Sequence, residues 1–194
     1  QTTDGGYIIC GGGDGGHIIL IKTDNSGNEQ WYQELGILNV ANGGYSVQQT
    51  TDGGYIITGK TGGGNRDVIL IKTDNNGNEE WHNTFGGNSD DIGYCVEQTS
   101  DGGYIICGET SVQNDCDLYV IKTDVNGNEE WYKIFDTGDY ENGTWIEQTS
   151  DGGFIITGHS NSDGIYLIKT DTQGNITSTF NIPINLNRKL EKVV

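Results

Sequence analysis

One pattern of residues recurs four times along this chain of 194 residues. Asp-Gly-Gly begins at Asp4, Asp52, Asp101 and Asp151, with spacings of 48, 49 and 50 residues. Ile-Lys-Thr-Asp and Gly-Asn recur at matching positions in every copy. A period of about 20–50 residues is typical of architectures in which each copy is one structural unit. We therefore predict a single domain of residues 1–194, with repeats at about 1–44, 45–93, 94–143 and 144–185 and a tail at 186–194.

Within one copy, local signals predict four short strands. In the third copy, residues 93–98 alternate in polarity and end in a Thr-Ser-Asp-Gly-Gly turn, which is typical of a tight hairpin. Residues 104–107, 118–121 and 129–135 supply three further strands. Four antiparallel strands in a repeat of about 49 residues are typical of a β-propeller blade. The predicted fold class is all-β, a propeller of four blades with four antiparallel strands each.

The first copy lacks its first strand, because residues 1–3 match the hairpin turn at residues 49–51. If the chain end is joined to its start, Val193 falls on the repeat position of Val47. A strand added there would close the ring and remove an exposed sheet edge. We predict that this closing strand, from the C-terminus, consists of Glu191, Lys192, Val193 and Val194.

Three alternatives to closure within one chain stay open. The chain could be a unit of a longer array, or its tail strand could insert into a neighbouring subunit and build a fibre. The tail could also form a short helix, because Leu186, Leu190 and Val193 have helical spacing. The chain contains no Met and begins with Gln1, which predicts a processed form or a segment of a longer protein.

Composition excludes several classes of protein. Gly accounts for 32 residues, and it costs roughly 1 kcal/mol at each helix-interior position, which argues against a helical bundle. The net charge of −18 argues against a nucleic-acid partner, because phosphates bind Lys and Arg. The longest apolar runs have four residues, so we expect no membrane insertion.

Three tryptophans follow the Gly-Asn turn in the first three copies. They are Trp31, Trp81 and Trp131, and the fourth copy has Ser178 at this position. Their repeated place on one face of a strand suits packing between blades, which we favour. A platform for stacking carbohydrate is the alternative.

Two motifs resemble known repeats. Asp-Gly-Gly-Tyr-Ile-Ile-x-Gly, followed by Ile-Lys-Thr-Asp-x-x-Gly-Asn-Glu-Glu-Trp, resembles the propeller repeats of secreted and cell-surface proteins of bacteria and archaea. The segment Asp74-x-x-Gly77-x-x-x-Trp81 is distantly similar to the tryptophan-docking motif of quinoprotein-type propellers, in which the Trp wedges one blade against the next. The resemblance implies an extracellular or cell-surface location.

Residues 74–79 alternate oxygen-bearing side chains around Gly77, and equivalent segments begin at Asp24, Asp124 and Asp171. Such oxygens are the ligands that Ca²⁺ prefers. A hairpin turn explains the same residues, because Asp and Asn accept local backbone hydrogen bonds and Gly adopts the left-handed conformation. Every copy needs this turn, so we expect no cofactor and keep Ca²⁺ as the alternative.

The four cysteines contain no Cys-x-x-Cys pair. If Gln98 lies opposite Tyr104 in the hairpin, then Cys95 lies opposite Cys107, and the two form a candidate cross-strand disulfide. Buried thiols are the alternative. Two glycosylation sequons begin at Asn142 and Asn175.

No catalytic motif emerges from the repeats. His17, His82 and His159 occupy non-equivalent repeat positions without metal-ligand spacing, and we expect structural or solvated roles. The blade-specific carboxylates are expected in solvated loops between blades; they are Asp90, Asp91, Asp136, Asp139 and Glu141.

We expect a non-enzymatic extracellular propeller that acts as a structural or protein-interaction scaffold, with protein or self-association as its mode of partnership. A self-assembling surface fibre joined through terminal strands is one alternative. A glycan- or Ca²⁺-binding propeller is another, and an enzyme with acidic residues around a central channel is the third.

Overall fold

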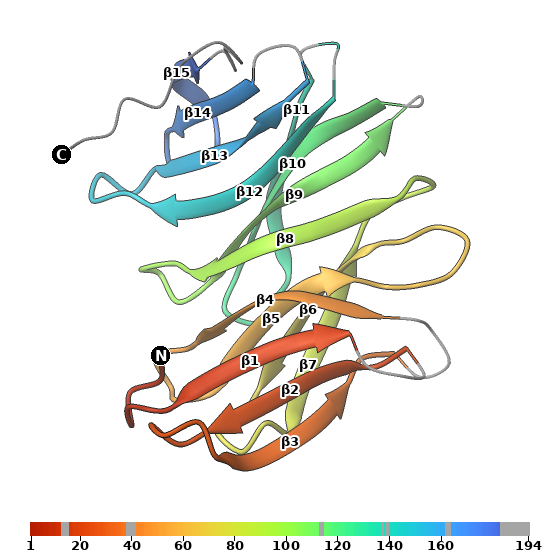
Figure 1. The fold of residues 1–194 in the computed structure, drawn as a ribbon. Coiled ribbons are helices and arrows are strands. Elements are labelled where there is room, and N and C mark those ends of the chain that lie inside the picture. Colours follow the sequence, from red (N-terminus) through yellow and green to blue (C-terminus); the bar gives the residue numbers. More distant parts are fainter. Residues whose placement is uncertain are drawn as a thin grey trace, which may run out of the picture.

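The computed structural model describes residues 1–12, 16–37, 42–112, 115–136, 138, 140–161 and 164–182. These residues form fifteen strands in four antiparallel sheets, which confirms the predicted all-β architecture. Within the same ranges, no helix is long and apolar enough to span a membrane. We call the sheets blades 1 to 4 in chain order, and Figure 1 shows them stacked one after another.

Within each blade, the strands are hydrogen-bonded to one another in chain order. In a blade of four strands, we call the edge formed by the first strand the inner edge and the edge formed by the last strand the outer edge. Blade 1 contains β1 (Tyr7–Gly12), β2 (Ile18–Thr23) and β3 (Glu29–Leu35). Blade 2 contains β4 (Gly43–Gln49), β5 (Tyr55–Lys60), β6 (Val68–Thr73) and β7 (Glu79–Phe85). Blade 3 contains β8 (Asp91–Gln98), β9 (Tyr104–Val112), β10 (Asp115–Thr123) and β11 (Glu129–Phe135). Blade 4 contains β12 (Glu141–Gln148), β13 (Phe154–Ser160), β14 (Gly164–Thr170) and β15 (Ile176–Ile182).

Several strands are longer than the sequence predicts. β9 continues to Val112 and β10 begins at Asp115, because the two strands pair up to Val112 and Asp115. The inner strands β4, β8 and β12 also begin earlier than expected, since their first residues pair with the second strand of the same blade. The predicted repeat boundaries at 44/45, 93/94 and 143/144 therefore fall inside these strands.

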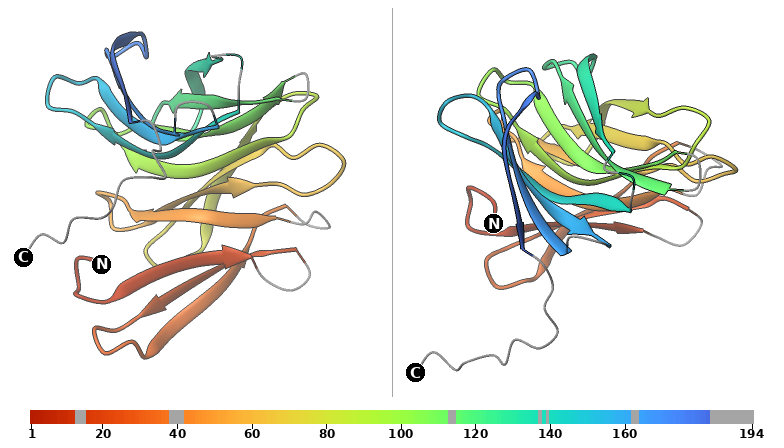
Figure 2. Two further views of the ribbon diagram at one scale, coloured as in Figure 1. Left: turned by 45° about the horizontal axis from the view of Figure 1, so that its top comes forward. Right: turned by 90° about the horizontal axis from the view of Figure 1, so that it is seen from above.

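Among the described residues, blade 1 has three strands, and none of them occupies the inner edge. The described hydrogen-bonded neighbour of β1 is β2. The predicted closing residues, Glu191, Lys192, Val193 and Val194, lie outside the described residues. Blades 1 and 4 lie at opposite ends of the stack in Figure 1 and in the left view of Figure 2. Hydrogen bonds among the described strands therefore do not show a closed ring.

The core lies between consecutive blades. We call the face of a blade that packs on the next blade its forward face, and the opposite face its backward face. Leu20 on the forward face of blade 1 packs in one cluster with Tyr55 and Ile57 on the backward face of blade 2. Leu70 and Tyr104 belong to the equivalent cluster between blades 2 and 3. Alternation along each strand supplies apolar residues to both faces, so a central blade is covered on both sides.

A lysine joins the repeated motifs of each blade, and it is buried in blades 1 to 3. In blade 2, Lys72 Nζ lies 2.9 Å from Asp52 Oδ2 and 3.0 Å from Glu80 Oε2, and it donates to the Thr73 carbonyl at 2.9 Å. The Lys72 side chain is 4% exposed, so these acceptors replace water around a buried charge. Lys22, Lys122 and Lys169 pair with the Asp of their own Asp-Gly-Gly motifs in the same way.

The same contact explains the two glycines of the motif. Gly53 has a φ of +89°, which favours glycine in the hairpin turn. A Cβ on Gly54 would lie 2.1 Å from the Thr73 carbonyl oxygen and 2.7 Å from Lys72 Nζ. The strand can approach the buried lysine only because Gly54 has no side chain.

We expect Gly54→Ala to lower the free energy of unfolding by about 1–3 kcal/mol, because its methyl group overlaps backbone atoms. Urea denaturation measures this change. Gly64→Ala is the matched control, since a Cβ there meets no atom within 4 Å. Equal stabilities of the two variants would contradict the close approach.

Candidate functional site

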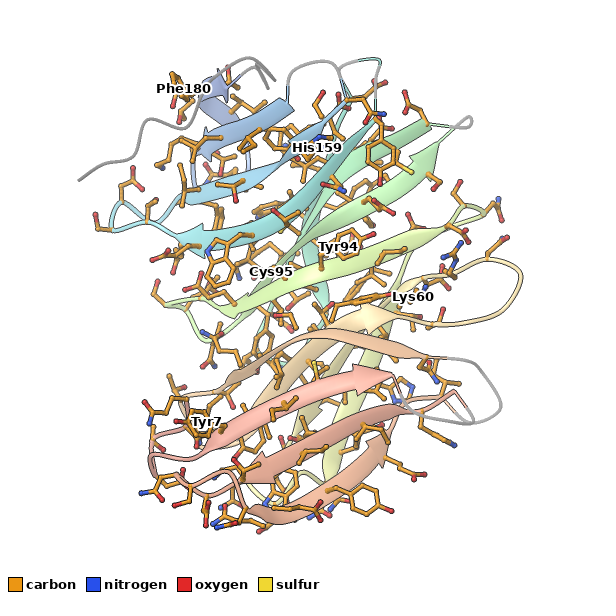
Figure 3. All side chains as sticks on the ribbon, in the orientation of Figure 1. Tyr7, Lys60, Tyr94, Cys95, His159 and Phe180 are labelled. Carbon is orange, nitrogen blue, oxygen red and sulfur yellow. The ribbon has the colours of Figure 1, made fainter. Side chains whose placement is uncertain are left out.

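Several residues that differ between otherwise similar blades are found on or beside the inner strands β4, β8 and β12. The position directly after the Tyr/Phe-Ile-Ile-x-Gly motif holds Lys60 in blade 2, Glu109 in blade 3 and His159 in blade 4. Figure 3 shows Lys60, Tyr94 and His159 on the side of the molecule formed by the inner strands. We call this surface the inner face.

A β-bulge in each inner strand presents a second variable residue. The pairing of β4 with β5 passes from Gly44 to Ser46, which leaves Tyr45 as the extra residue. The same shift occurs around Tyr94 in β8 and Thr144 in β12. Bulges re-aim side chains, and here they turn a variable residue out of the regular ladder.

Blades 2 and 3 combine these residues into an aromatic and charged cluster. The rings of Tyr45 and Tyr94 lie 5.6 Å apart, and Lys60 Nζ lies 5.8 Å from the Tyr45 ring centroid. The Tyr140 hydroxyl donates to Glu109 Oε2 at 2.8 Å. Burial, followed by the charge of Glu109, raises the pKa of the Tyr94 hydroxyl well above its ordinary value. We call these five residues the inner cluster.

A pocket of 350 Å³ lies farther along the inner strands, with Cys95 and Glu97 in its wall and Trp145 at its side. The Trp145 side chain is 59% exposed. Side chains of one inner strand bind the backbone of the next, since Gln98 N donates to Gln48 Oε1 at 2.8 Å. Burial raises the pKa of the Glu97 carboxyl. The pocket therefore combines an aromatic ring with amide and carboxylate acceptors.

The structure places each predicted packing tryptophan between its own blade and the next. The ring of Trp81 lies 5.9 Å from that of Tyr104, and a Cβ on Gly127 would lie 2.5 Å from Trp81 Cζ3. Trp31 and Trp131 make the equivalent contacts with blades 2 and 4. These rings lie at blade interfaces, away from the inner cluster.

The candidate Ca²⁺ ligands hold a hairpin turn together. Asp74 Oδ1 accepts hydrogen bonds from Asn76 N and Asn78 N at 2.8 Å, and Oδ2 accepts one from Asn78 Nδ2 at 2.9 Å. Asp24, Asp124 and Asp171 accept the same set of bonds. These bonds, led by the side chain of Asn78, lower the pKa of Asp74. Among the described residues, no three His, Cys, Asp or Glu side chains are grouped as metal ligands.

The other singled-out polar residues are dispersed. His82 Nδ1 lies 2.6 Å from Glu79 Oε1 on an outer strand, while His17 is half-buried beside β2. The sequon Asn175 is exposed in the last hairpin turn, and Asn142 is half-buried at the start of β12. Only His159, among these, shares the repeat position of the inner cluster residues Lys60 and Glu109.

Two blade-specific carboxylates are buried, and their predicted solvation is wrong. Asp91 and Glu141 are each 3% exposed, because they lie at the packed start of inner strands. Asp90 forms an ion pair instead, with its Oδ2 2.7 Å from Arg66 Nη2. Asp139 lies outside the described residues. The starts of β8 and β12 therefore bury acidic groups, whereas Asp136 in the loop before β12 is exposed.

Asp117 completes this acidic region, and the sequence analysis did not single it out. It is 3% exposed, and its Oδ1 has no hydrogen-bond partner among the described residues. Burial, with the nearby charges of Asp136, Asp115 and Glu141, raises its pKa to about 6. The place of Asp117 directly before the apolar run of residues 118–121 was the available sequence signal.

The two cysteines of the candidate disulfide are direct cross-strand partners. Cys95 lies opposite Cys107 in the pairing of β8 with β9, and both carry free thiols in this structure. Hydrogen bonding with Cys107 lowers the pKa of the Cys95 thiol to about 7. Burial raises the pKa of the Cys107 thiol, which is fully buried.

The sequence analysis missed most of the inner cluster. It treated the repeats by what they share, whereas Lys60, Glu109 and the bulge residues Tyr45 and Tyr94 are positions where the repeats differ. A position-by-position comparison of the copies carries this signal. The convergence of these positions on one face required the structure.

The chain matches no protein-family model and no curated protein. Among solved structures, it is similar to the subtype N10 neuraminidase-like protein of A/little yellow-shouldered bat/Guatemala/060/2010, with a TM-score of 0.54 and 15% identity. That match covers 85% of this chain, which spans only 50% of the neuraminidase-like chain. A GH43 endo-arabinanase from Bacillus licheniformis matches with a TM-score of 0.32 and 11% identity, over 92% of this chain and 99% of its own. The first similarity establishes a β-propeller type of fold.

We expect stability to be highest near about pH 4, because two carboxyl groups act in opposite directions. Asp117, with a pKa of about 6, takes up a proton more readily in the folded state, so its stabilising contribution is present at low pH and is lost as the pH rises through 6. Burial alone would raise the pKa of Asp52, but bonds from Lys72 and Thr50 lower it to about 2, so its contribution is lost as the pH falls from about 4 to 2.

Urea denaturation across the pH range measures both limbs. Asp117→Asn is expected to flatten the rise in stability between about pH 7 and 5 while leaving the acid limb unchanged. Glu34→Gln, at an exposed position in β3, is the control for the loss of one negative charge. Wild-type stability that does not change between pH 7 and pH 5 would contradict the role of Asp117.

We expect mild oxidation with diamide to join Cys95 to Cys107, because the thiolate of Cys95 faces its cross-strand neighbour. Intact mass spectrometry would show the loss of two hydrogen atoms, and peptide mapping would identify the pair. Cys95→Ser abolishes the change, whereas Cys10→Ser does not. Linkage through Cys10 or Cys116 would contradict this pairing.

Proposed function

We propose that this chain is a non-enzymatic β-propeller scaffold that binds a protein partner across its inner face. The supporting observation is a division between residues that the blades share and residues in which they differ. The shared motifs build the blades, as the contacts of Lys72 and Trp81 illustrate. Several differing residues, among them Lys60, Glu109 and Trp145, lie on the inner face, where they can set specificity.

The chemistry of the inner face suits a protein partner. Tyr45 is 46% exposed and Trp145 is 59% exposed, and both project from inner strands. Aromatic side chains contribute much of the binding energy at protein interfaces and lose little conformational entropy on binding. Lys60 and Glu97 add charges of both signs beside them, which would orient a partner.

The repeated carboxylates support binding rather than catalysis. Asp52 is engaged by Lys72, and Asp74 is engaged by the turn that it begins. Their oxygens therefore serve the architecture in every blade. The resemblance of the repeats to secreted and cell-surface propellers supports an extracellular or cell-surface location as part of this proposal.

A glycan ligand is the second candidate, favoured by the pocket beside Trp145. An exposed indole ring can stack on the apolar face of a sugar, while Gln48 and Glu97 can accept hydrogen bonds from its hydroxyl groups. The pocket volume of 350 Å³ lies within the range of about 300–1,000 Å³ that is typical of small-molecule sites.

Selection of a phage-displayed peptide library on the immobilised chain tests the proposal. We expect the selected peptides to lose about tenfold or more in affinity for Tyr45→Ala and Trp145→Ala, because both rings would be central to the interface. Tyr132→Ala is the matched control, since Tyr132 is 52% exposed on the outer strand β11.

Two other outcomes are decisive. Peptides that bind all three variants equally would contradict an inner-face site. The second outcome is that members of a sugar panel raise the melting temperature of the chain, that Trp145→Ala alone loses this effect, and that no peptides are selected. This outcome would replace the protein partner with a glycan.

A further inference from the structure

The backward face of blade 1 is uncovered. Tyr7 is 44% exposed and Ile9 is 51% exposed, whereas Tyr55 and Ile57 at the same repeat positions in blade 2 are 2% and 0% exposed. The difference has one structural cause, which is that blade 1 covers blade 2 and the structure describes no blade behind blade 1. This face keeps the apolar side chains of an internal blade interface.

The forward face of blade 4 is uncovered in the same way. Ile165 is 51% exposed and Leu167 is 37% exposed, whereas Val68 and Leu70 at the same repeat positions in blade 2 are 1% and 0% exposed. Phe180, on the outer strand of this face, is 61% exposed. A strand face of this kind is covered by the following blade at the interfaces between blades 1 and 2, 2 and 3, and 3 and 4.

The turn glycines provide an independent indication. A Cβ on Gly77 would meet Trp31 Cζ3 at 2.6 Å and Gln33 Cγ at 2.9 Å, so side chains of the preceding blade cover this glycine. Gly27 holds the same position in blade 1, and a Cβ there would meet no atom within 4 Å. In the repeat register, Phe180 of blade 4 stands where Gln33 stands in blade 1. Phe180 is therefore placed to cover a turn such as that of Gly27.

One polar contact recurs at each interface between consecutive blades. Thr3 N donates to Gln49 Oε1 at 2.8 Å, and Thr51 N donates to Gln98 Oε1 at 2.8 Å. Ser100 N donates to Gln148 Oε1 at 2.8 Å, which continues the series into blade 4. Each hairpin turn thus docks on an inner-strand glutamine of the next blade. The ends of the stack present the two halves of this repeated interface.

We propose that the forward face of blade 4 packs on the backward face of blade 1 of a second copy of this chain. The two faces match because they share most positions of the pair of repeat surfaces that packs between consecutive blades; the described part of blade 1 lacks the inner strand, and blade 4 has Ser178 in place of the packing tryptophan. Blades 1 and 4 lie at opposite ends of the stack, so a second copy can reach either face without rearrangement of the first (Figure 1). Such a head-to-tail contact is heterologous, and it continues until a ring closes or a filament grows.

This assembly goes beyond the proposed function and does not depend on it, because the inner cluster of blades 2 and 3 takes no part in the contact. Trp145 is shared between the inner face and the forward face of blade 4, since it holds the repeat position at which Cys95 packs between blades 3 and 4. Charge sets its salt dependence. Each chain carries a net charge of −18, so two copies repel each other at long range. Screening at about 1 M NaCl shortens the Debye length to about 3 Å, and association is strengthened at high salt.

Sedimentation velocity of the full chain at increasing concentration tests the contact. We expect the wild type to form species larger than the chain mass of 21.0 kDa, and more of them in about 1 M than in about 0.15 M NaCl. Phe180→Glu and Ile9→Glu, each at an exposed position, are expected to remain monomeric. Tyr132→Glu, equally exposed but outside both end faces, is expected to associate like the wild type. Circular dichroism melting verifies that each variant is folded.

A mixing experiment identifies the geometry. Phe180→Glu retains an intact blade 1 face, and Ile9→Glu retains an intact blade 4 face. An equimolar mixture is therefore expected to form a single species of twice the 21.0 kDa chain mass, although each variant alone is monomeric. Wild type that stays monomeric under all conditions, or a mixture that forms no dimer, would overturn the proposal. Dimers of either variant alone would indicate a symmetric contact and would also overturn it.

Discussion

A lysine ammonium group organises every blade of this protein, and in blades 1 to 3 it is buried. Lys72 and its counterparts lie in the sheet interior, where an unpaired charge would be costly, so each blade must supply acceptors at fixed positions. Asp52 comes from the hairpin turn, Glu80 from the outer strand and the Thr73 carbonyl from the lysine's own strand. Three motifs that are distant in the repeat are therefore one structural unit. Gly54 belongs to the same unit, because any side chain there would displace the lysine.

This requirement divides the residues into two groups. Residues that neutralise the lysine, form the turns or pack between blades recur from copy to copy, because each blade needs the same contacts in order to fold. Positions on or beside the inner strands escape that constraint, and there the copies diverge, as Glu109 and Trp145 illustrate. The bulges separate these positions from the regular ladder, so they vary without disturbing the pairing. Function is therefore best sought on the inner face and at the ends of the stack.

Much of the fold could be predicted from the sequence because its signals are local and repeated. Alternating strands and Asp-Gly-Gly turns predicted four antiparallel sheets, and the missing first strand of blade 1 followed from the match of residues 1–3 to residues 49–51. The register of Cys95 opposite Cys107 followed from the hairpin turn between them. The burial of Asp91 and Glu141 was not predicted, because it depends on packing against a neighbouring blade.

The sequence by itself determined what each repeat becomes: strand order within a blade, turn type, and the residues that alternate between its two faces. Those properties depend on contacts within about 49 residues. The tertiary structure decided how the blades are placed, and with it which faces are covered. Tyr55 and Tyr7 hold the same repeat position, yet Tyr55 is buried and Tyr7 is exposed for this reason. The exposure of a face depends on whether another blade packs on it, and the sequence around a residue does not specify that blade.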